Sequence, residues 1–208
     1  MLAIDHLIVV VHDLETTASQ YDQDKGLASV AGGLHPGHGT VNRIVPLGGS
    51  YIELMAVVDR DQAAASPLGS WVLRRLVEQG EGPAALCLRT DDLDAAARRT
   101  MRTPLRMSRQ RPDGVELNWE LVALDAAITE GRPFFIRWHV DDSEHPGRAP
   151  VTHRCRAVGI DWVELGGDPH RIDAWLGPHE LPIRHLGGEP GPHRFGVARA
   201  GGDPIVID

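Results

Sequence analysis

The chain has 208 residues, of which 42% are hydrophobic and 24% charged, and 29 acidic against 21 basic side chains give a net charge of −8. This composition is typical of a soluble globular protein with a hydrophobic core. The acidic balance excludes the basic surface that nucleic acid or an anionic membrane requires. The two cysteines, Cys87 and Cys155, form no paired metal or disulfide motif, so we expect a cytoplasmic protein.

The first predicted element is a strand over Ala3–Val11. It is apolar on both of its faces except at Asp5 and His6, which is typical of a strand that is covered on both sides. Because this apolar run is short and no basic region precedes it, we expect neither a signal peptide nor a membrane span. A helix is expected next, with Asp13 as its N-cap and Gly26 as its end.

The following elements complete a β-α-β-β-β order. Short strands are predicted near Ala28–Gly32, Gly39–Pro46 and Ser50–Val57, and the Gly48–Gly49 pair indicates a tight hairpin turn. A helix is then expected over Pro67–Glu78, where apolar residues recur at helical spacing.

The same order recurs further along the chain. A second strand, helix and three strands occupy residues 84–140, with a turn predicted at 111–114, and a shortened third copy follows a connector and occupies residues 153–208. Asp13, Asp91/Asp92 and Asp168 each start the helix of one copy, which gives a repeat of about 75–80 residues. The first copy spans residues 3–57.

Two stretches carry a resemblance to known proteins. "IDHLIVVVHDLE" followed by "YIELMAV" resembles a module of the vicinal oxygen chelate superfamily, which includes glyoxalase I, extradiol dioxygenases and the bleomycin- and fosfomycin-resistance proteins. "GGLHPGHGTVNRIVPLGGSYIELMAV" with "PFFIRWHVDDSEHPG" is similar to the glyoxalase-like domain family within it. The resemblance implies an α+β fold of repeated βαβββ modules. Their curled mixed sheets form a cup with helices on its outer face, and residues 1–208 make a single domain with a degraded third module at the C-terminus.

Alternation along two strands places His6 and Glu53 inside that cup. If Leu7 packs under a helix, His6 faces inward, and if Ile52 and Leu54 pack likewise, Glu53 does too. An imidazole and a carboxylate are half of a site for Zn, Ni, Fe or Mn. In the superfamily such an ion holds two vicinal oxygens of a substrate and acts as a Lewis acid. The resemblance therefore implies that His6 and Glu53 are catalytic residues and metal ligands.

The second module departs from this pattern. Counting back from its helix start sets Ala85 opposite His6, and aligning "YIEL" with "FIRW" sets Arg137 opposite Glu53. A guanidinium cannot bind a metal ion. Either Arg137 and Glu53 form a buried ion pair without a metal, or Arg137 binds a substrate carboxylate or phosphate while Glu53 holds an ion.

Several other polar side chains lie near the predicted cup. A third histidine close to a strand end would complete a metal site with His6 and Glu53, and His139 would share the inner face if Arg137 does. Thr40 and Asn42 lie on one strand face, where they either line the pocket or hydrogen-bond the strand end. The predicted ligand-binding residues are His35, Thr40, Asn42, Arg137, His139 and His145.

Three classes of function follow from these features. The first is an enzyme of lyase, isomerase or dioxygenase type that acts on a small molecule with vicinal oxygens, with or without a divalent metal ion. The second is a non-catalytic protein that sequesters a small molecule or drug, which the replacements at Ala85 and Arg137 favour. The third is a degenerate module that assembles with partners, and the incomplete third copy favours a homodimer because exposed strand edges need cover.

Overall fold

The computed structural model of the chain describes residues 1–110 and 114–208, so the predicted turn at 111–114 lies almost entirely outside the described residues. The strands and helices follow in the order β1 (Leu2–Val10), α1 (Leu14–Lys25), β2 (Val30–His35), β3 (Thr40–Pro46), β4 (Tyr51–Val57), α2 (Arg60–Ala64), α3 (Pro67–Glu78), β5 (Gly82–Thr90), α4 (Leu93–Thr100), β6 (Leu105–Gln110), β7 (Glu116–Val122), α5 (Leu124–Glu130), β8 (Phe134–Trp138), two short 3-10 turns (Asp142–Glu144 and Pro146–Arg148), β9 (Ala157–Gly166), α6 (Pro169–Leu176), β10 (Ile183–His185), β11 (Gly191–Arg199) and β12 (Ile205–Ile207).

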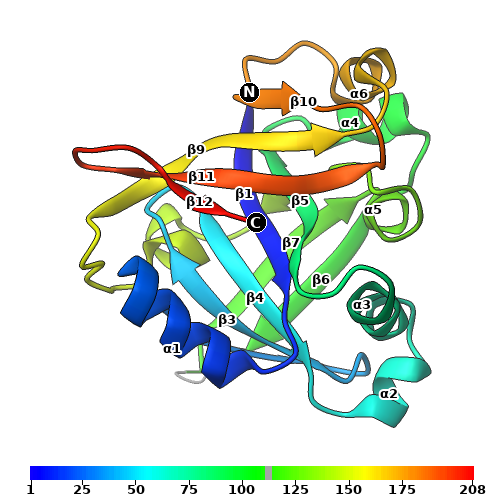
Figure 1. The fold of residues 1–208 in the computed structure, drawn as a ribbon. Helices are drawn as coiled ribbons and strands as arrows, with labels where there is room; N and C mark the ends of the chain where they lie inside the picture. The colour runs from blue at the N-terminus through cyan, green and yellow to red at the C-terminus, as the bar shows by residue number, and fades with distance from the viewer. Residues whose placement is uncertain (111–113) are drawn as a thin grey trace.

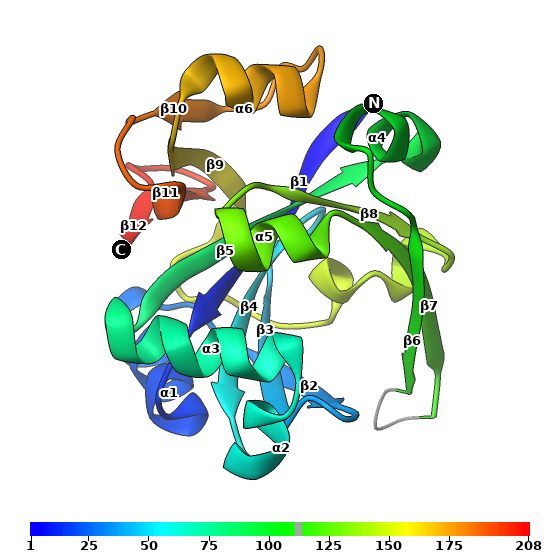
Figure 2. The same ribbon diagram turned by 90° about the vertical axis from the view of Figure 1, so that its right-hand side faces the viewer.

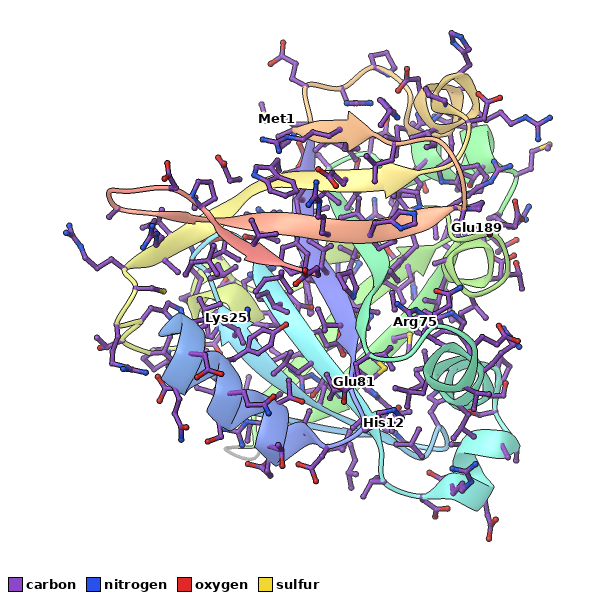
Figure 3. All side chains as sticks on the ribbon, viewed as in Figure 1. Met1, His12, Lys25, Arg75, Glu81 and Glu189 are labelled. Atoms are coloured by element: carbon purple, nitrogen blue, oxygen red, sulfur yellow. The ribbon has the colours of Figure 1, made fainter. Side chains whose placement is uncertain are left out.

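The first two modules share one curled sheet. Its eight strands run in the order β2-β3-β4-β1-β5-β8-β7-β6, and the modules join where β1 pairs antiparallel with β5. Within each module the first strand pairs parallel with the last, β1 with β4 and β5 with β8. The backbone N–H of His12, just after β1, donates to the carboxylate of Glu81 just before β5, at 2.6 Å (Figure 3).

Side-chain caps start the helix of each module, as the sequence predicts. Asp13, Asp92 and Asp168 each accept a hydrogen bond from the backbone N–H three residues ahead. The short helices α2 and α5 were not predicted. Strand β7 stops at Val122, because Ala123 adopts a φ of 68° and the chain then turns into α5.

The outer face of the curled sheet is covered by helices and by the third module. Leu7, Leu54, Leu86 and Phe135 point to this face and are buried against α1, α4 and α6 and against the small sheet β10-β9-β11-β12. Figure 1 shows β11 crossing over β1 and β5, and Figure 2 shows α6 and the small sheet as a separate layer. The degraded third copy therefore covers the junction of the first two modules from outside.

The inner face is filled at one end by α3 and α5. Trp71 and Val72 of α3 and Ala127 of α5 are buried against Ile8 and Phe134 of the sheet. In Figure 2, β6 and β7 form one wall of the cup and stand across from β2 and β3. In the described part of the chain, no helix has both the length and the apolar character needed to cross a membrane.

Candidate functional site

A cavity lies within the curve of the large sheet. Its volume is about 90 Å³, which accommodates a few water molecules or a small organic group. One wall carries polar side chains from β1 to β4, and the other comes from β6, β7 and β8 and is apolar except for Arg109. The residues that line it are His6, Ile8, His35, Asn42, Ile44, Tyr51, Glu53, Met55, Leu68, Met107, Arg109, Trp119, Leu121, Leu124, Phe134, Ile136 and Trp138.

An irregularity in β1 brings Asp5 beside His6. The pairing of β1 with β5 shifts register between Ile4 and His6, which leaves Asp5 without a place in the ladder. Such a bulge changes the direction of the side chain, and here the Asp5 carboxylate reaches His6 Nδ1 at 2.7 Å. This contact places the proton of the neutral His6 ring on Nδ1, which donates it to Asp5, and His6 Nε2 faces Glu53 on the cavity wall.

The fully buried Asp5 is held by three groups besides His6. His145 Nε2 and Trp138 Nε1 lie 3.1 Å from its second carboxylate oxygen, and Arg89 lies 3.8 Å away. Burial raises the pKa of Asp5, but the hydrogen bonds from His145 and His6 outweigh that effect and hold it well below its usual range. Asp5 is therefore an ionised residue that orients the His6 ring.

Glu53 is buried with its carboxylate between two histidines. Its Oε1 accepts a hydrogen bond from Asn42 Nδ2 at 2.6 Å and lies 3.5 Å from His35 Nε2, while its Oε2 lies 3.6 Å from His6 Nε2. Burial raises the pKa of Glu53, but His35, the charge on His6 and the Asn42 amide lower it to about 2. Glu53 is thus an ionised carboxylate at neutral pH.

His35 is oriented in the same way as His6. Its Nδ1 lies 2.8 Å from the hydroxyl of the buried Thr40, and its Nε2 lies 3.3 Å from Asn42 Nδ2. These contacts assign the His35 proton to Nδ1, so its Nε2 lone pair also faces Glu53. Two imidazole lone pairs and a carboxylate therefore converge, which is stable only with a cation there, either a proton or a metal ion.

Two sets of side chains are candidates to hold a metal ion. Asp5, His6 and Cys87 have potential ligand atoms within 4.8 Å of one another. However, the Asp5 oxygens already accept hydrogen bonds, and burial, together with the charges of Asp5 and Glu53, raises the pKa of the Cys87 thiol. The convergent set of His6, His35 and Glu53 fits better, because each imidazole has its Nδ1 held and directs its Nε2 towards Glu53.

The strand register corrects the predicted alignment of the second module. Because Asp13 and Asp92 cap the corresponding helices of the two modules, Ala85 is the counterpart of His6, as the sequence indicates, and Cys87 is the counterpart of Ile8. Glu53 lies beside Ile8, and Phe134 lies beside Cys87, so Phe134 is the counterpart of Glu53. The predicted match of Glu53 with Arg137 was wrong by three residues.

Arg137 and His139 do not reach the cavity. Phe134 and Ile136 face inward along β8, so Arg137 lies on the outer face, where its Nη2 donates to Glu120 at 2.7 Å. His139 Nε2 lies 2.8 Å from the same Glu120 oxygen. The predicted Glu53–Arg137 pair is therefore absent from the described structure, and the predicted inward position of both side chains was wrong because alternation was counted from the wrong register.

The other predicted residues divide between the cavity wall and its support. His6, His35, Asn42 and Glu53 line the cavity, whereas Thr40 lies behind His35, and His145 lies behind Asp5. Sequence reasoning missed Asp5 as a partner of His6 and missed Arg109, which lines the cavity from β6. A charged residue next to a histidine in an apolar strand was the available signal for Asp5.

Comparisons with known proteins agree with this architecture. A family model described as "Glyoxalase-like domain" matches residues 4–179, and the chain belongs to this family. A hypothetical protein from Staphylococcus aureus superposes with a TM-score of 0.68 at 18% identity, over 92% of this chain and 88% of that chain, and shows the fold.

Two methylmalonyl-CoA epimerases superpose less well. The Mycobacterium tuberculosis protein has a TM-score of 0.45 at 21% identity, over 65% of this chain and 86% of that chain. A variant of the Streptomyces coelicolor protein, in complex with 2-nitronate-propionyl-CoA, has a TM-score of 0.47 at 23% identity, over 65% of this chain and 94% of that chain. A search of curated protein sequences gave no significant match.

Proposed function

We propose that this protein is an enzyme that holds a divalent metal ion between His6, His35 and Glu53 and acts on a small molecule with vicinal oxygens in the cavity. The observation that carries the proposal is the convergence of two Nε2 atoms on one ionised, buried carboxylate. Two histidines and a carboxylate suit Zn, Ni, Fe or Mn. When bound, the ion would supply Lewis-acid chemistry of the lyase, isomerase or dioxygenase type.

The protein's own residues prepare this site. Asp5 and Thr40 hold the Nδ1 atoms of His6 and His35, which fixes the imidazole orientation that a metal ligand needs. Tyr51 stacks on the His6 ring with 4.5 Å between ring centroids and restricts its rotation. Burial and the neighbouring charges of Asp5 and Glu53 raise the pKa of the Tyr51 phenol well above 10, so it stays protonated.

The second module leaves room for a ligand beside the polar wall. A complete metal site would have two further ligand side chains in the second module, at the positions of Ala85 and Phe134. Neither residue can bind a metal ion, so a substrate can occupy this side of the site next to Glu53. Trp119, Trp138 and Phe134 give this side of the cavity an apolar, aromatic surface. This arrangement supports the binding of a small, partly apolar ligand whose oxygens lie next to Glu53.

A second candidate function is sequestration of a small molecule without catalysis or metal. The same replacements at Ala85 and Phe134 favour it, because they remove half of the side chains that a four-ligand site would have. In that case His6 and His35 would carry the balancing protons and form ion pairs with Glu53.

Elemental analysis of untagged protein, purified without chelators, tests the proposal. Stoichiometric Zn, Ni, Fe or Mn is expected in the wild type, with loss in Glu53→Gln and retention in Glu120→Gln, a matched change of a buried glutamate on the outer face. A wild-type protein without metal, which also fails to bind added metal, contradicts the proposal. Turnover of dicarbonyl or catechol compounds then separates an enzyme from a binder that only retains them.

We also propose that the protein is a cytoplasmic homodimer. Both cysteines are free, which suits a reducing compartment. The small sheet has two edge strands, β10 and β12, each with an exposed apolar side chain: Leu186 directly follows β10, and Val206 lies on β12. A second copy of the chain would cover these edges. A mass of one chain by light scattering at micromolar concentration contradicts the dimer.

A further inference from the structure

Arg109 is a cation at the closing edge of the cup. It lies on β6, the last strand of the large sheet, on the inner face together with Met107. A Cβ atom placed on Gly33 of β2, the first strand of the sheet, would lie 3.3 Å from Arg109 Nη1. The two ends of the curled sheet therefore approach each other at Arg109, and the absence of a side chain at Gly33 makes space for the guanidinium.

The Nη1 atom of Arg109 is buried and has no hydrogen-bond partner among residues 1–110 and 114–208. Other arginines of the large sheet have acidic partners there: Arg106 and Arg137 both pair with Glu120. A buried guanidinium nitrogen without an acceptor is costly, so an acceptor from outside these residues would stabilise it.

The cavity wall around Arg109 supplies no anion for this purpose. Met107, Trp119 and Leu121 lie on the same wall, and the carboxylate of Glu53 already has Asn42, His6 and His35 as partners. Arg109 is the one lysine or arginine that lines the cavity in the described chain. The cavity thus has a metal-type ligand set on its polar wall and one unpaired cationic nitrogen at its closing edge.

We propose that Arg109 binds a carboxylate of the ligand, so that the substrates of this site are small organic acids with a hydrophobic body and vicinal oxygens. The vicinal oxygens in this inference rest on the proposed function, whereas the carboxylate rests on Arg109 alone. A planar guanidinium matches a carboxylate with two parallel hydrogen bonds. The aromatic side chains that line the cavity with Arg109, which include Tyr51 and Trp119, favour a flat ligand body.

The position of Arg109 also locates the proposed carboxylate site within the cup. Arg109 and Ile44 line both this cavity and a neighbouring groove, which the connector residues 143–150 border on the far side. Arg148 and Glu144 line that groove as well, one with a positive and one with a negative charge. The carboxylate therefore lies at the boundary between cavity and groove, and the oxygen-bearing end of the ligand points towards Glu53.

Benzoate and benzamide test the carboxylate site, because they have nearly the same size and shape and differ in charge. Isothermal titration of chelator-treated wild-type protein is expected to show benzoate binding about 10- to 100-fold more tightly than benzamide, the range for a charge-assisted hydrogen bond. Arg109→Gln is expected to abolish this preference. Arg109→Lys, which retains the charge without the fork, is expected to retain part of it.

Arg106→Gln is the matched control, since Arg106 lies on the same strand but on the outer face. It is expected to keep the preference for benzoate. Equal affinity for the two probes in the wild type, no detectable benzoate binding, or an unchanged preference in a folded Arg109→Gln protein each overturns the proposal. Metal content distinguishes the two proposals: Arg109→Gln is expected to lose the benzoate preference and to keep the metal content of the wild type, whereas a wild type that binds no metal but prefers benzoate contradicts the proposed function alone.

Discussion

Replacing Glu53 by glutamine is expected to weaken the dependence of stability on acid. The pKa of Glu53 is about 2 in the folded protein, against an ordinary value of 4.5. Its ionised form therefore contributes stability that is fully present above pH 4.5 and is lost as the pH falls through about 2. The gap between the two pKa values corresponds to about 3 kcal/mol of unfolding free energy.

Urea unfolding measures this contribution. The free energy of unfolding is followed by tryptophan fluorescence between pH 7 and pH 3 in the presence of a chelator, so that bound metal does not contribute. Between pH 7 and pH 3 the wild type is expected to lose about 60% of that contribution. This loss comes in addition to any loss shown by Glu53→Gln, which has no group to titrate at this position. Glu15→Gln, an exposed carboxyl group paired with Arg43, is the control and should follow the wild type.

Parallel curves for the wild type and Glu53→Gln would refute the reasoning. They would mean that the folded protein does not favour the ionised form of Glu53 over the protonated form. The convergence of His6 and His35 on this carboxylate would then have no electrostatic consequence, and the argument for a cation at the site would fail with it.

Three further changes test other parts of the site. Asp5→Asn is expected to lower metal affinity about 10- to 100-fold in a competition assay with a chelator, because it removes the charge that orients His6; unchanged affinity would contradict that role. Gly32→Ala is expected to weaken metal binding also, since its methyl group would overlap the Asn42 amide that donates to Glu53, and a normal metal content would show that the amide is dispensable. Arg137→Gln is expected to leave ligand affinity unchanged and to destabilise the fold by about 1 kcal/mol in thermal unfolding; lost ligand binding would place it at the cavity after all.

The sequence by itself determined which side chains of β1 and β4 lie on the same face of the sheet. Alternation along β1 and β4 predicts that His6 and Glu53 share one face, and the structure places them 3.6 Å apart. Aspartate caps predicted the three module helices, because a capping interaction involves only residues three apart. These features depend on local periodicity, which a single sequence contains.

Only the tertiary structure decided how far each strand is shifted against its neighbours. Period-2 alternation assigns a residue to a face of the sheet, but it does not say which residues of two neighbouring strands lie side by side. Only the observed register shows that Phe134, not Arg137, is the counterpart of Glu53. The bulge at Asp5 and the arrival of His145 from a distant connector are likewise invisible in the local pattern. The approach of Arg109 to Gly33 depends on the closure of the whole eight-stranded sheet, which is a property of all its twists and registers together.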